Sequence, residues 1–327
     1  MTPAWPAVST EEGFMGFYLN RREFLKFCGK LSLALCGTEC LTEDLARAFM
    51  KIARKEPPVI WLTGQACSGD SISLVYTDSP GLVPLLTSLV DLKFHPVLSV
   101  VQGEEVLRII EEMKGKGGYI LCFEGAIPLR MKGACTIGEE YLADFLEEVV
   151  EEALAVIACG TCASYGGIPA ANPETGAVSV PEYLKRIGIE KPVVRVPGCP
   201  MNGVRFTGTV AYFVAYGRLP KLDEDGRPVM YYSEVIHQNC QRFQWFNQDH
   251  YVMDYAQDKR KCLFRMGCRG PVTHADCPLR CWNRNTSWCV DANTPCVGCA
   301  HPAWPWSEVE GIYTDPYRVK PEAFIGG

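Results

Sequence analysis

The sequence lacks several features that mark common protein classes. No apolar run approaches the ~20 residues that span a bilayer, and residues 325–327 end the chain without a hydrophobic anchor, so we expect no transmembrane anchor of its own. It has no Gly-x-Gly-x-x-Gly motif and no phosphate-binding loop, which argues against a bound nucleotide. No basic stripe stands out and the net charge is −6, so nucleic acid is not an expected partner.

Cysteine is the residue that is unusually abundant. The chain has 17 cysteines among 327 residues. Disulfide frameworks belong mainly to small secreted domains, whereas this length and a hydrophobic content of 47% supply a core without them. Zinc and iron–sulfur sites are the alternatives, and the cysteine spacing decides between them. The length also predicts two domains.

The N-terminal segment has the pattern of an export address. Arg21 and Arg22, followed by Phe24-Leu25-Lys26, resemble a twin-arginine signal, and a short apolar stretch follows. An amphipathic helix with a basic start is the alternative. We predict that residues 1–56 form the signal segment and that the folded protein works outside the cytoplasm, in the periplasm. Three cysteines would leave with this segment and are excluded from the chemistry: Cys28, Cys36 and Cys40.

Residues 57–230 alternate between strand patterns and helix patterns. Short β-branched, apolar runs bounded by glycine predict buried parallel strands at residues 59–62, 96–101, 119–123, 155–159 and 193–196. Residues 139–154 predict a helix whose glutamates form a solvated face. The alternation predicts a flavodoxin-like, doubly wound parallel sheet. The residues expected on the buried face of the helix are Leu142, Phe145, Leu146, Val149, Val150 and Leu154.

Three cysteines follow predicted strands directly. Cys67 comes after the first strand, Cys162 after the fourth and Cys199 after the fifth, each in a turn rich in glycine or proline. In a doubly wound sheet, ligands bind beyond the carboxyl ends of the strands. A lone cysteine at a strand end is usually only buried, but three at one edge predict a metal site.

Residues 231–327 have a different character and predict a smaller, irregular, cysteine-rich iron–sulfur domain. Eight cysteines lie between residues 237 and 299, with little periodicity of either kind, and such a segment needs metal centres to hold it together. His237 and Cys240 alone would suit zinc, which needs four ligands. Zinc does not explain two adjacent quartets of ligands and a third set in the first domain. Several sites with soft ligands in one chain are typical of an electron conduit.

Several motifs resemble those of the small subunits of nickel–iron hydrogenases. The resemblance extends from the twin-arginine segment to about Trp306. It rests on Val59-Ile60-Trp61-Leu62, Glu124-Gly125-Ala126-Ile127-Pro128, Gly160-Thr161-Cys162-Ala163-Ser164-Tyr165-Gly166-Gly167, Pro197-Gly198-Cys199-Pro200, Gly267-Cys268-Arg269-Gly270-Pro271, Trp282-Asn283, Trp288-Cys289 and Pro295-Cys296-Val297-Gly298-Cys299.

The resemblance implies three 4Fe-4S clusters in a row, with the nickel–iron site in a partner subunit. At the position of Cys289 many relatives have proline, and their medial cluster has three irons. A cysteine at this position implies a four-iron medial cluster. The six-cysteine proximal cluster of oxygen-tolerant relatives is excluded, because its two extra positions are Gly69 and Gly167. The implied ligands are Cys67, Asp70, Cys162 and Cys199 for the proximal cluster, His237, Cys240, Cys262 and Cys268 for the distal cluster, and Cys277, Cys289, Cys296 and Cys299 for the medial cluster.

Asp70 is the main departure from the family pattern, which has cysteine at that position. A carboxylate carries the same formal charge as a thiolate, so it could complete the ligand set. The alternatives are ligation by Cys159 or a three-iron cluster with Asp70 unbound. Glu124 matches the family, in a role that could equally be structural. Cys122, Cys135 and Cys281 match no ligand position, and we expect each to be a small buried hydrophobe.

The implied activity is that of an uptake hydrogenase, a dihydrogen:acceptor oxidoreductase of which this chain is the subunit without nickel. It would pass electrons from proximal to medial to distal cluster, and on to a cytochrome or other redox acceptor. The expected partner is the large subunit, in a dimer of heterodimers. The alternatives are a subunit of a hydrogen-sensing complex, a respiratory-complex subunit, and a zinc scaffold without redox function.

Overall fold

The computed structural model describes residues 56–77, 81–256 and 260–306. Its centre is a five-stranded sheet in the order β2-β1-β3-β7-β9, in which every neighbouring pair is parallel. In chain order this is 2-1-3-4-5, the order of a flavodoxin-like fold, so the predicted fold class is confirmed. The strands are β1 (Pro58–Thr63), β2 (Asp91–Phe94), β3 (Tyr119–Glu124), β7 (Ala153–Cys159) and β9 (Val193–Val196).

The second strand does not lie where the sequence predicted it. We expected residues 96–101, but β2 is Asp91–Phe94, and residues after it form a turn. Nδ1 of His95 accepts the backbone N–H groups of Val97 and Leu98, which fixes this turn. Val100 is exposed on the surface despite its β-branched side chain. β2 is an edge strand, which tolerates the two charged residues in its four-residue sequence.

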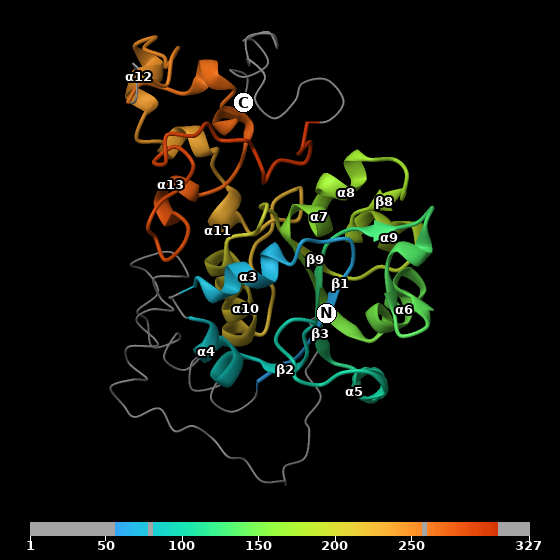
Figure 1. Cartoon of the computed structure of the whole chain (residues 1–327). Helices are drawn as coiled ribbons and strands as arrows, with labels where there is room; N and C mark the ends of the chain where they lie inside the picture. Colours follow the sequence, from blue (N-terminus) through green and yellow to red (C-terminus); the bar gives the residue numbers. More distant parts are fainter. Residues whose placement is uncertain (1–55, 78–80, 257–259, 307–327) are drawn as a thin grey trace, which may run out of the picture.

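Helices cover both faces of the sheet (Figure 1). On one face, Leu74 of α3 (Gly69–Val75) and Phe206 of α10 (Gly203–Tyr216) pack with Val59 and Trp61 of β1. On the other face, β1 contributes Ile60 and Leu62 to a second core cluster. This cluster includes side chains of α5 (Glu104–Lys116), α6 (Leu142–Glu151) and α9 (Val180–Ile187). Alternate residues of a strand therefore serve two cores, as the strand geometry requires.

The helix predicted over residues 139–154 is shorter in the structure. Residues 140 and 141 belong to a two-residue strand, and Leu154 belongs to β7, where it is exposed. Leu154 was therefore wrongly placed on the buried face. The helical pattern ran into a following strand that begins two residues after α6 ends. The other five apolar residues of that face are buried, and the glutamates at 147, 148, 151 and 152 are exposed, as predicted.

Short elements complete the first part of the chain. They are α4 (Leu82–Pro84), a π-helix (Leu85–Leu89), β4 (Ile127–Pro128), a 3₁₀ turn (Lys132–Ala134), β5 (Thr136–Ile137), β6 (Glu140–Tyr141), α7 (Gly160–Tyr165), α8 (Gly167–Ala171) and β8 (Ala177–Val178). β4 pairs with β8 and β5 with β6, both antiparallel.

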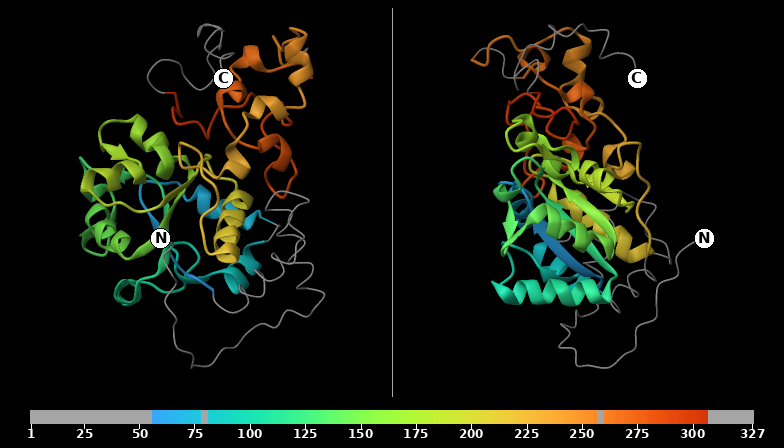
Figure 2. Two further views of the ribbon diagram at one scale, coloured as in Figure 1. Left: turned by 180° about the vertical axis from the view of Figure 1, so that it is seen from behind. Right: turned by 90° about the vertical axis from the view of Figure 1, so that its right-hand side faces the viewer.

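The cysteine-rich segment has no long element among its described residues, as its lack of periodicity predicted. It contains α11 (Val229–Tyr232), α12 (Phe243–Asn247), α13 (Cys277–Arg280) and 3₁₀ turns at Ile236–Asn239, Phe264–Met266 and Gly270–Val272. Its own hydrophobic cluster is built around Tyr232, Leu263 and Trp288. Figures 1 and 2 show the segment, in orange and red, at the end of the sheet where α7 begins. The division at residues 56 and 230 stays a prediction.

Two predictions concern parts of the chain outside the described residues. The twin-arginine pair Arg21 and Arg22 and the cysteines Cys28, Cys36 and Cys40 all lie before residue 56. Within the described residues, no helix is long and apolar enough to cross a membrane.

Candidate cluster-binding sites

The structure brings the three strand-end cysteines together at the carboxyl edge of the sheet. Burial, then the charges of Cys199 and Asp70, raises the pKa of the Cys162 thiol to about 12, and Cys67 adds to this effect. Burial also raises the pKa of Cys199, as do the charges of Asp70 and Cys67. The four acidic groups therefore lie within electrostatic range of one another. This crowding favours the protonated, neutral forms, and only a cationic group such as a metal centre would stabilise these side chains together as anions.

Close backbone approach shapes this edge. Gly160 has a φ of +77°, and a Cβ there would lie 2.1 Å from Oδ2 of Asp70. A Cβ at Gly167 would lie 2.9 Å from the sulfur of Cys162. Glycine at these two positions leaves room for the acidic side chains, because any larger residue would collide with them.

Asp70 is buried beneath the thiols. Its Oδ1 accepts the backbone N–H of Met201 at 2.5 Å. Burial, followed by repulsion from Glu124, raises the pKa of its carboxyl to about 7, while the hydrogen bond from Met201 opposes the shift. The carboxyl thus has one backbone partner and lies near Cys162 and Cys199, whose thiol pKa values it raises.

The carboxyl of Glu124 accepts hydrogen bonds from the first turn of α3. This fully buried carboxyl accepts the backbone N–H groups of Asp70 at 3.0 Å and Ser71 at 3.4 Å, the Ser71 hydroxyl, and Nε1 of Trp61 at 3.3 Å. These contacts give Glu124 a structural role in placing Asp70. Cys159, one of the alternative ligands, is fully buried and its pKa is raised by burial and by a contact with Cys122.

A second group of cysteines lines one cavity of about 360 Å³. All four residues assigned to the medial set lie on its wall, and Cys199 and Arg205 lie there too. Burial and the charge of Cys277 raise the pKa of Cys299 to about 12. The cavity is mostly apolar, with Trp282 and Trp288 among its lining residues. The four residues are Cys277, Cys289, Cys296 and Cys299.

The third group comes from a stretch of chain that precedes the second, residues 237–268. Burial raises the pKa of Cys268 to about 12, and the charges of Cys262 and Cys240 contribute to the shift. His237 lies against Phe243 and Phe246, with ring centroids 5.0 and 4.5 Å away. Its Nε2 is buried without a hydrogen-bond partner among the described residues, and burial lowers its pKa to about 4. A neutral imidazole with an unpartnered nitrogen has the chemistry of a metal ligand.

The second group is close to each of the other two. The backbone N–H of Cys199, in the first group, lowers the pKa of Cys299 in the second, and the charge of Cys268, in the third, raises the pKa of Cys296 in the second. The cysteines of the second group therefore have neighbours in both other sets. Within the described part of the chain, no three His, Cys, Asp or Glu side chains are grouped in a way that could hold a single metal ion.

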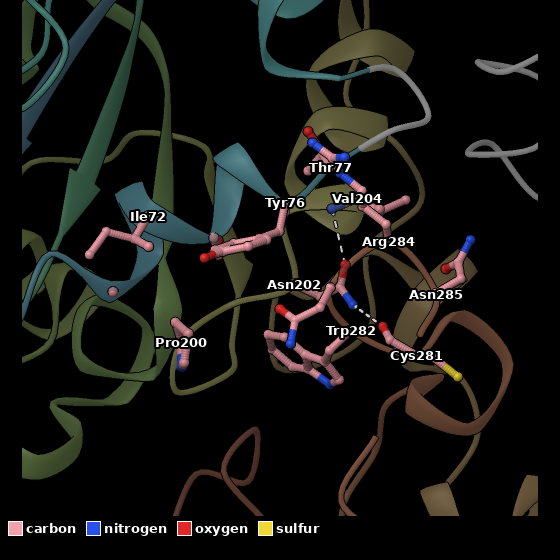
Figure 3. A pocket seen from close by; sticks show the side chains of 14 residues that line it. Ile72, Tyr76, Thr77, Pro200, Asn202, Val204, Cys281, Trp282, Arg284 and Asn285 are labelled. Carbon is pink, nitrogen blue, oxygen red and sulfur yellow. Dashed lines mark hydrogen bonds between the residues drawn. The ribbon is translucent and has the colours of Figure 1, made fainter. Parts of the chain in front are cut away.

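A further cavity, of about 170 Å³, separates α3 from the loop after α13 (Figure 3). The side chain of Asn202 closes one side of it. Its Oδ1 accepts the N–H of Val204 at 3.0 Å, and its Nδ2 donates to the carbonyl oxygen of Cys281 at 2.7 Å. Cys281 and Cys135 are only half-buried, so the expectation that both are buried was wrong, whereas Cys122 is buried as expected. Cys281 and Cys135 lie in irregular segments beside turns, where the local sequence predicts burial poorly.

Sequence reasoning missed the residues that surround the thiols. Thr161 links the first two groups, and Arg205 and Arg242 are buried beside cysteines of the second and third. The indole N–H of Trp304 lowers the pKa of Cys199, although Nε1 makes no hydrogen bond within the described residues. The burial of an arginine cannot be predicted from a local sequence pattern. Of these residues, only Thr161 lies in a motif that the sequence singled out, Gly160-Thr161-Cys162.

Two family models match the chain. One, described as the C-terminal part of the NiFe/NiFeSe hydrogenase small subunit, matches residues 232–310. The other, described as NADH ubiquinone oxidoreductase, 20 Kd subunit, matches residues 67–213. The respiratory alternative accounts for the match to residues 67–213 alone, whereas the C-terminal match points to hydrogenases.

Whole-chain relatives agree with the C-terminal match. The chain is 34% identical to the periplasmic [NiFeSe] hydrogenase small subunit of Desulfomicrobium baculatum, over 88% of this chain and 96% of that protein. It is 35% identical to the hydrogenase-2 small chain of Escherichia coli K12, over 86% of this chain and 76% of that protein. A solved structure of the H2-activated D. baculatum [NiFeSe] hydrogenase has a TM-score of 0.75 at 34% identity, covering 80% of this chain and 99% of that one.

The flavodoxin-like sheet and the cysteine-rich segment that follows it define part of a hydrogenase, an oxidoreductase. The match covers nearly the whole length of relatives that are named as hydrogenase small subunits. The chain belongs to the family of nickel–iron hydrogenase small subunits.

Proposed function

We propose that this chain is the electron-transfer subunit of a nickel–iron uptake hydrogenase and that it holds three 4Fe-4S clusters in a row. The observation that supports this most directly is the position of the medial set, which has neighbours in both of the other cysteine groups. Iron–sulfur clusters supply one-electron redox chemistry, with potentials set by ligands, charge and hydrogen bonds. The protein's part is to fix ligation, spacing and polarity along the row.

The residues present fit such groups. Cys67, Asp70, Cys162 and Cys199 would hold the proximal cluster, His237, Cys240, Cys262 and Cys268 the distal cluster, and Cys277, Cys289, Cys296 and Cys299 the medial cluster. The fit rests on crowded acidic groups at the proximal edge, a thiol-lined cavity in the medial position, and an unpartnered buried imidazole nitrogen in the distal position.

The proximal edge has the features of a surface shielded by a partner protein. Cys67 is exposed, although the other proximal thiols are half-buried. Close to it in the chain, Ile72 of α3 and Tyr76, the residue that follows α3, are 51% and 50% exposed. Apolar side chains grouped around an exposed ligand would be shielded by a partner, and we assign that place to the large subunit, which holds the nickel–iron site.

The proposal extends to location and acceptor. Relatives named as periplasmic and uptake hydrogenases support a place outside the cytoplasm and the oxidation of dihydrogen there. Export by the twin-arginine route is inferred from Arg21 and Arg22. Electrons would then pass from the distal site to a cytochrome or another redox acceptor, and the complex would assemble as a dimer of heterodimers.

Counting iron and sulfide in the purified large–small complex tests the proposal. We expect about twelve iron atoms attributable to this chain and no oxidised three-iron EPR signal. The complex should also reduce a dye under dihydrogen. Zinc in place of iron, or a complex inert to dihydrogen, would contradict the proposed function.

The variant Asp70→Ala tests the least regular ligand. We expect it to change the proximal EPR signal, while Asp70→Cys restores a four-iron signal with a different potential. An unchanged proximal signal in Asp70→Ala would remove Asp70 from the ligand set and leave the rest of the proposal intact.

A further inference from the structure

Arg205 is a fully buried cation beside the medial cysteines. It lies in the first turn of α10, and its exposed fraction is 0%. Its Nε donates to Oδ1 of Asp276 at 2.8 Å, and its Nη2 donates to the sulfur of Cys277 at 3.1 Å. The guanidinium also lies 5.2 Å from the ring centroid of Tyr232. A charge this deeply buried normally has all its N–H groups satisfied.

One of its nitrogens is not satisfied by the protein. Nη1 is buried and has no hydrogen-bond partner among the described residues. Arg205 lines the same cavity as Cys277, Cys289, Cys296 and Cys299. A buried charged donor without an acceptor costs more free energy than a neutral one. We therefore expect the group that fills this cavity to accept a hydrogen bond from Nη1 of Arg205.

The carboxylate beside Cys277 does not serve Arg205 alone. Asp276 is shared, because Arg205 donates to its Oδ1 while Nε of Arg280 donates to its Oδ2. Arg205 thus contacts this shared carboxylate through Nε only, while Nη2 faces the Cys277 sulfur and Nη1 has no partner among the described residues. At the proximal edge Asp70 takes the place of a thiolate ligand of the same formal charge, and the additional buried charged group beside it is the carboxyl of Glu124. The buried charged group next to the medial thiols is thus a cation, Arg205, whereas the one next to the proximal ligands is an anion, Glu124.

We propose that Arg205 is a positioning and charge-setting residue that raises the reduction potential of the medial cluster above that of the proximal one. The inference rests on the proposed function. Electron transfer between them adds one negative charge to the medial group and removes one from the proximal group, with no proton required. A fixed cation near the medial cluster stabilises its reduced state, and the buried carboxyl of Glu124 destabilises the reduced state of the proximal cluster, so electrons are favoured to leave the proximal site.

EPR-monitored redox titration of the purified complex tests this. Two variants of neighbouring residues are expected to shift the medial midpoint potential in opposite directions. Arg205→Met should lower the medial midpoint potential, because it removes the cation. Asp276→Asn should raise it, because it removes the carboxylate that offsets the cation while keeping the side-chain shape. We expect each variant to change the equilibrium constant for electron exchange between the two clusters about tenfold, or about 59 mV for one electron.

Arg227→Met is the matched control. Arg227 lies 5.9 Å from the same Tyr232 ring, but it is paired with Asp223 at 2.7 Å and Asp225 at 3.2 Å. These two carboxylates neutralise its charge away from the medial cysteines, so the medial potential should stay unchanged. Arg205→Lys keeps the charge without the fork of donors and should give a smaller shift than Arg205→Met.

The outcomes separate this inference from the proposed function. Equal shifts of the same sign in Arg205→Met and Asp276→Asn would indicate a general structural effect and overturn the inference, as would an unshifted potential in both. A wild-type complex without any medial EPR signal would instead overturn the proposed function.

Discussion

The hydroxyl of Thr161 donates a hydrogen bond to the carbonyl oxygen of Cys299, across 138 positions of sequence. The same hydroxyl oxygen accepts the backbone N–H of Gly198 at 2.9 Å, and the N–H of Thr161 donates to the carbonyl of Gly198 at 2.8 Å. Thr161 therefore joins the turn after β7, the turn after β9 and the segment that ends in Cys299. These are the segments that carry Cys162, Cys199 and Cys299.

Replacing Thr161 with valine should loosen this junction. The change keeps the side-chain shape but leaves the Gly198 N–H and the Cys299 carbonyl without their partner, which costs about 1–3 kcal/mol for a buried group. We expect a lower thermal midpoint of the purified complex and faster loss of iron to a chelator. Thr161→Ser, which retains the hydroxyl, should resemble the wild type. Equal iron loss in both variants would show that the hydroxyl is not what matters.

Replacing Gly160 with alanine should displace Asp70. The new Cβ would lie 2.1 Å from the carboxyl oxygen, so the side chain or the turn must move. Gly188→Ala is the control, because Gly188 has a φ of +74° against +77° for Gly160 and no atom within 4 Å of a built Cβ. Both variants share the backbone strain of about 1–2 kcal/mol, and only Gly160→Ala adds the collision.

The proximal EPR signal distinguishes the two glycine variants. We expect Gly160→Ala to alter it in the same sense as Asp70→Ala, and Gly188→Ala to leave it as in the wild type while lowering the thermal midpoint. A proximal signal that is unchanged in Gly160→Ala would mean that the carboxyl position does not affect that site.

His95 predicts part of the acid sensitivity of the fold. It is buried against Trp61, with ring centroids 4.8 Å apart, and burial lowers its pKa to about 4. Its Nδ1 accepts two N–H groups, so the neutral tautomer carries its hydrogen on Nε2. The unfolded chain binds a proton near the ordinary value of about 6.5 and the folded chain does not. Stability is therefore complete above about pH 6.5 and is lost as the pH falls toward 4, by at most about 3 kcal/mol.

The variant His95→Asn isolates this contribution, because its amide oxygen can accept the same N–H groups without titrating. The wild type should lose thermal stability relative to the variant between about pH 6.5 and pH 4.5. The other buried histidines are present in both proteins and drop out of the difference. Parallel stability curves over this range would show that His95 already carries its proton in the folded protein.

Local patterns predicted the sheet and the strand-end cysteines because both depend on short-range features. Buried strands need runs of apolar, β-branched residues, and the carboxyl ends of parallel strands meet at one edge. The same reasoning misplaced the second strand, since β2 at the sheet edge needs less apolar character than an interior strand. It also extended a helix into β7, because Leu154 continues the helical period by coincidence.

The sequence by itself determined which ligand types are present, how they are spaced, and which family the chain resembles. Only the tertiary structure decided that Thr161 reaches Cys299, that Asp70 lies against Gly160, and that Arg205 is buried at Cys277. These contacts join segments far apart in the chain. Their energetics depend on desolvation and on which charges meet in the interior, and neither quantity is a property of any local stretch of sequence.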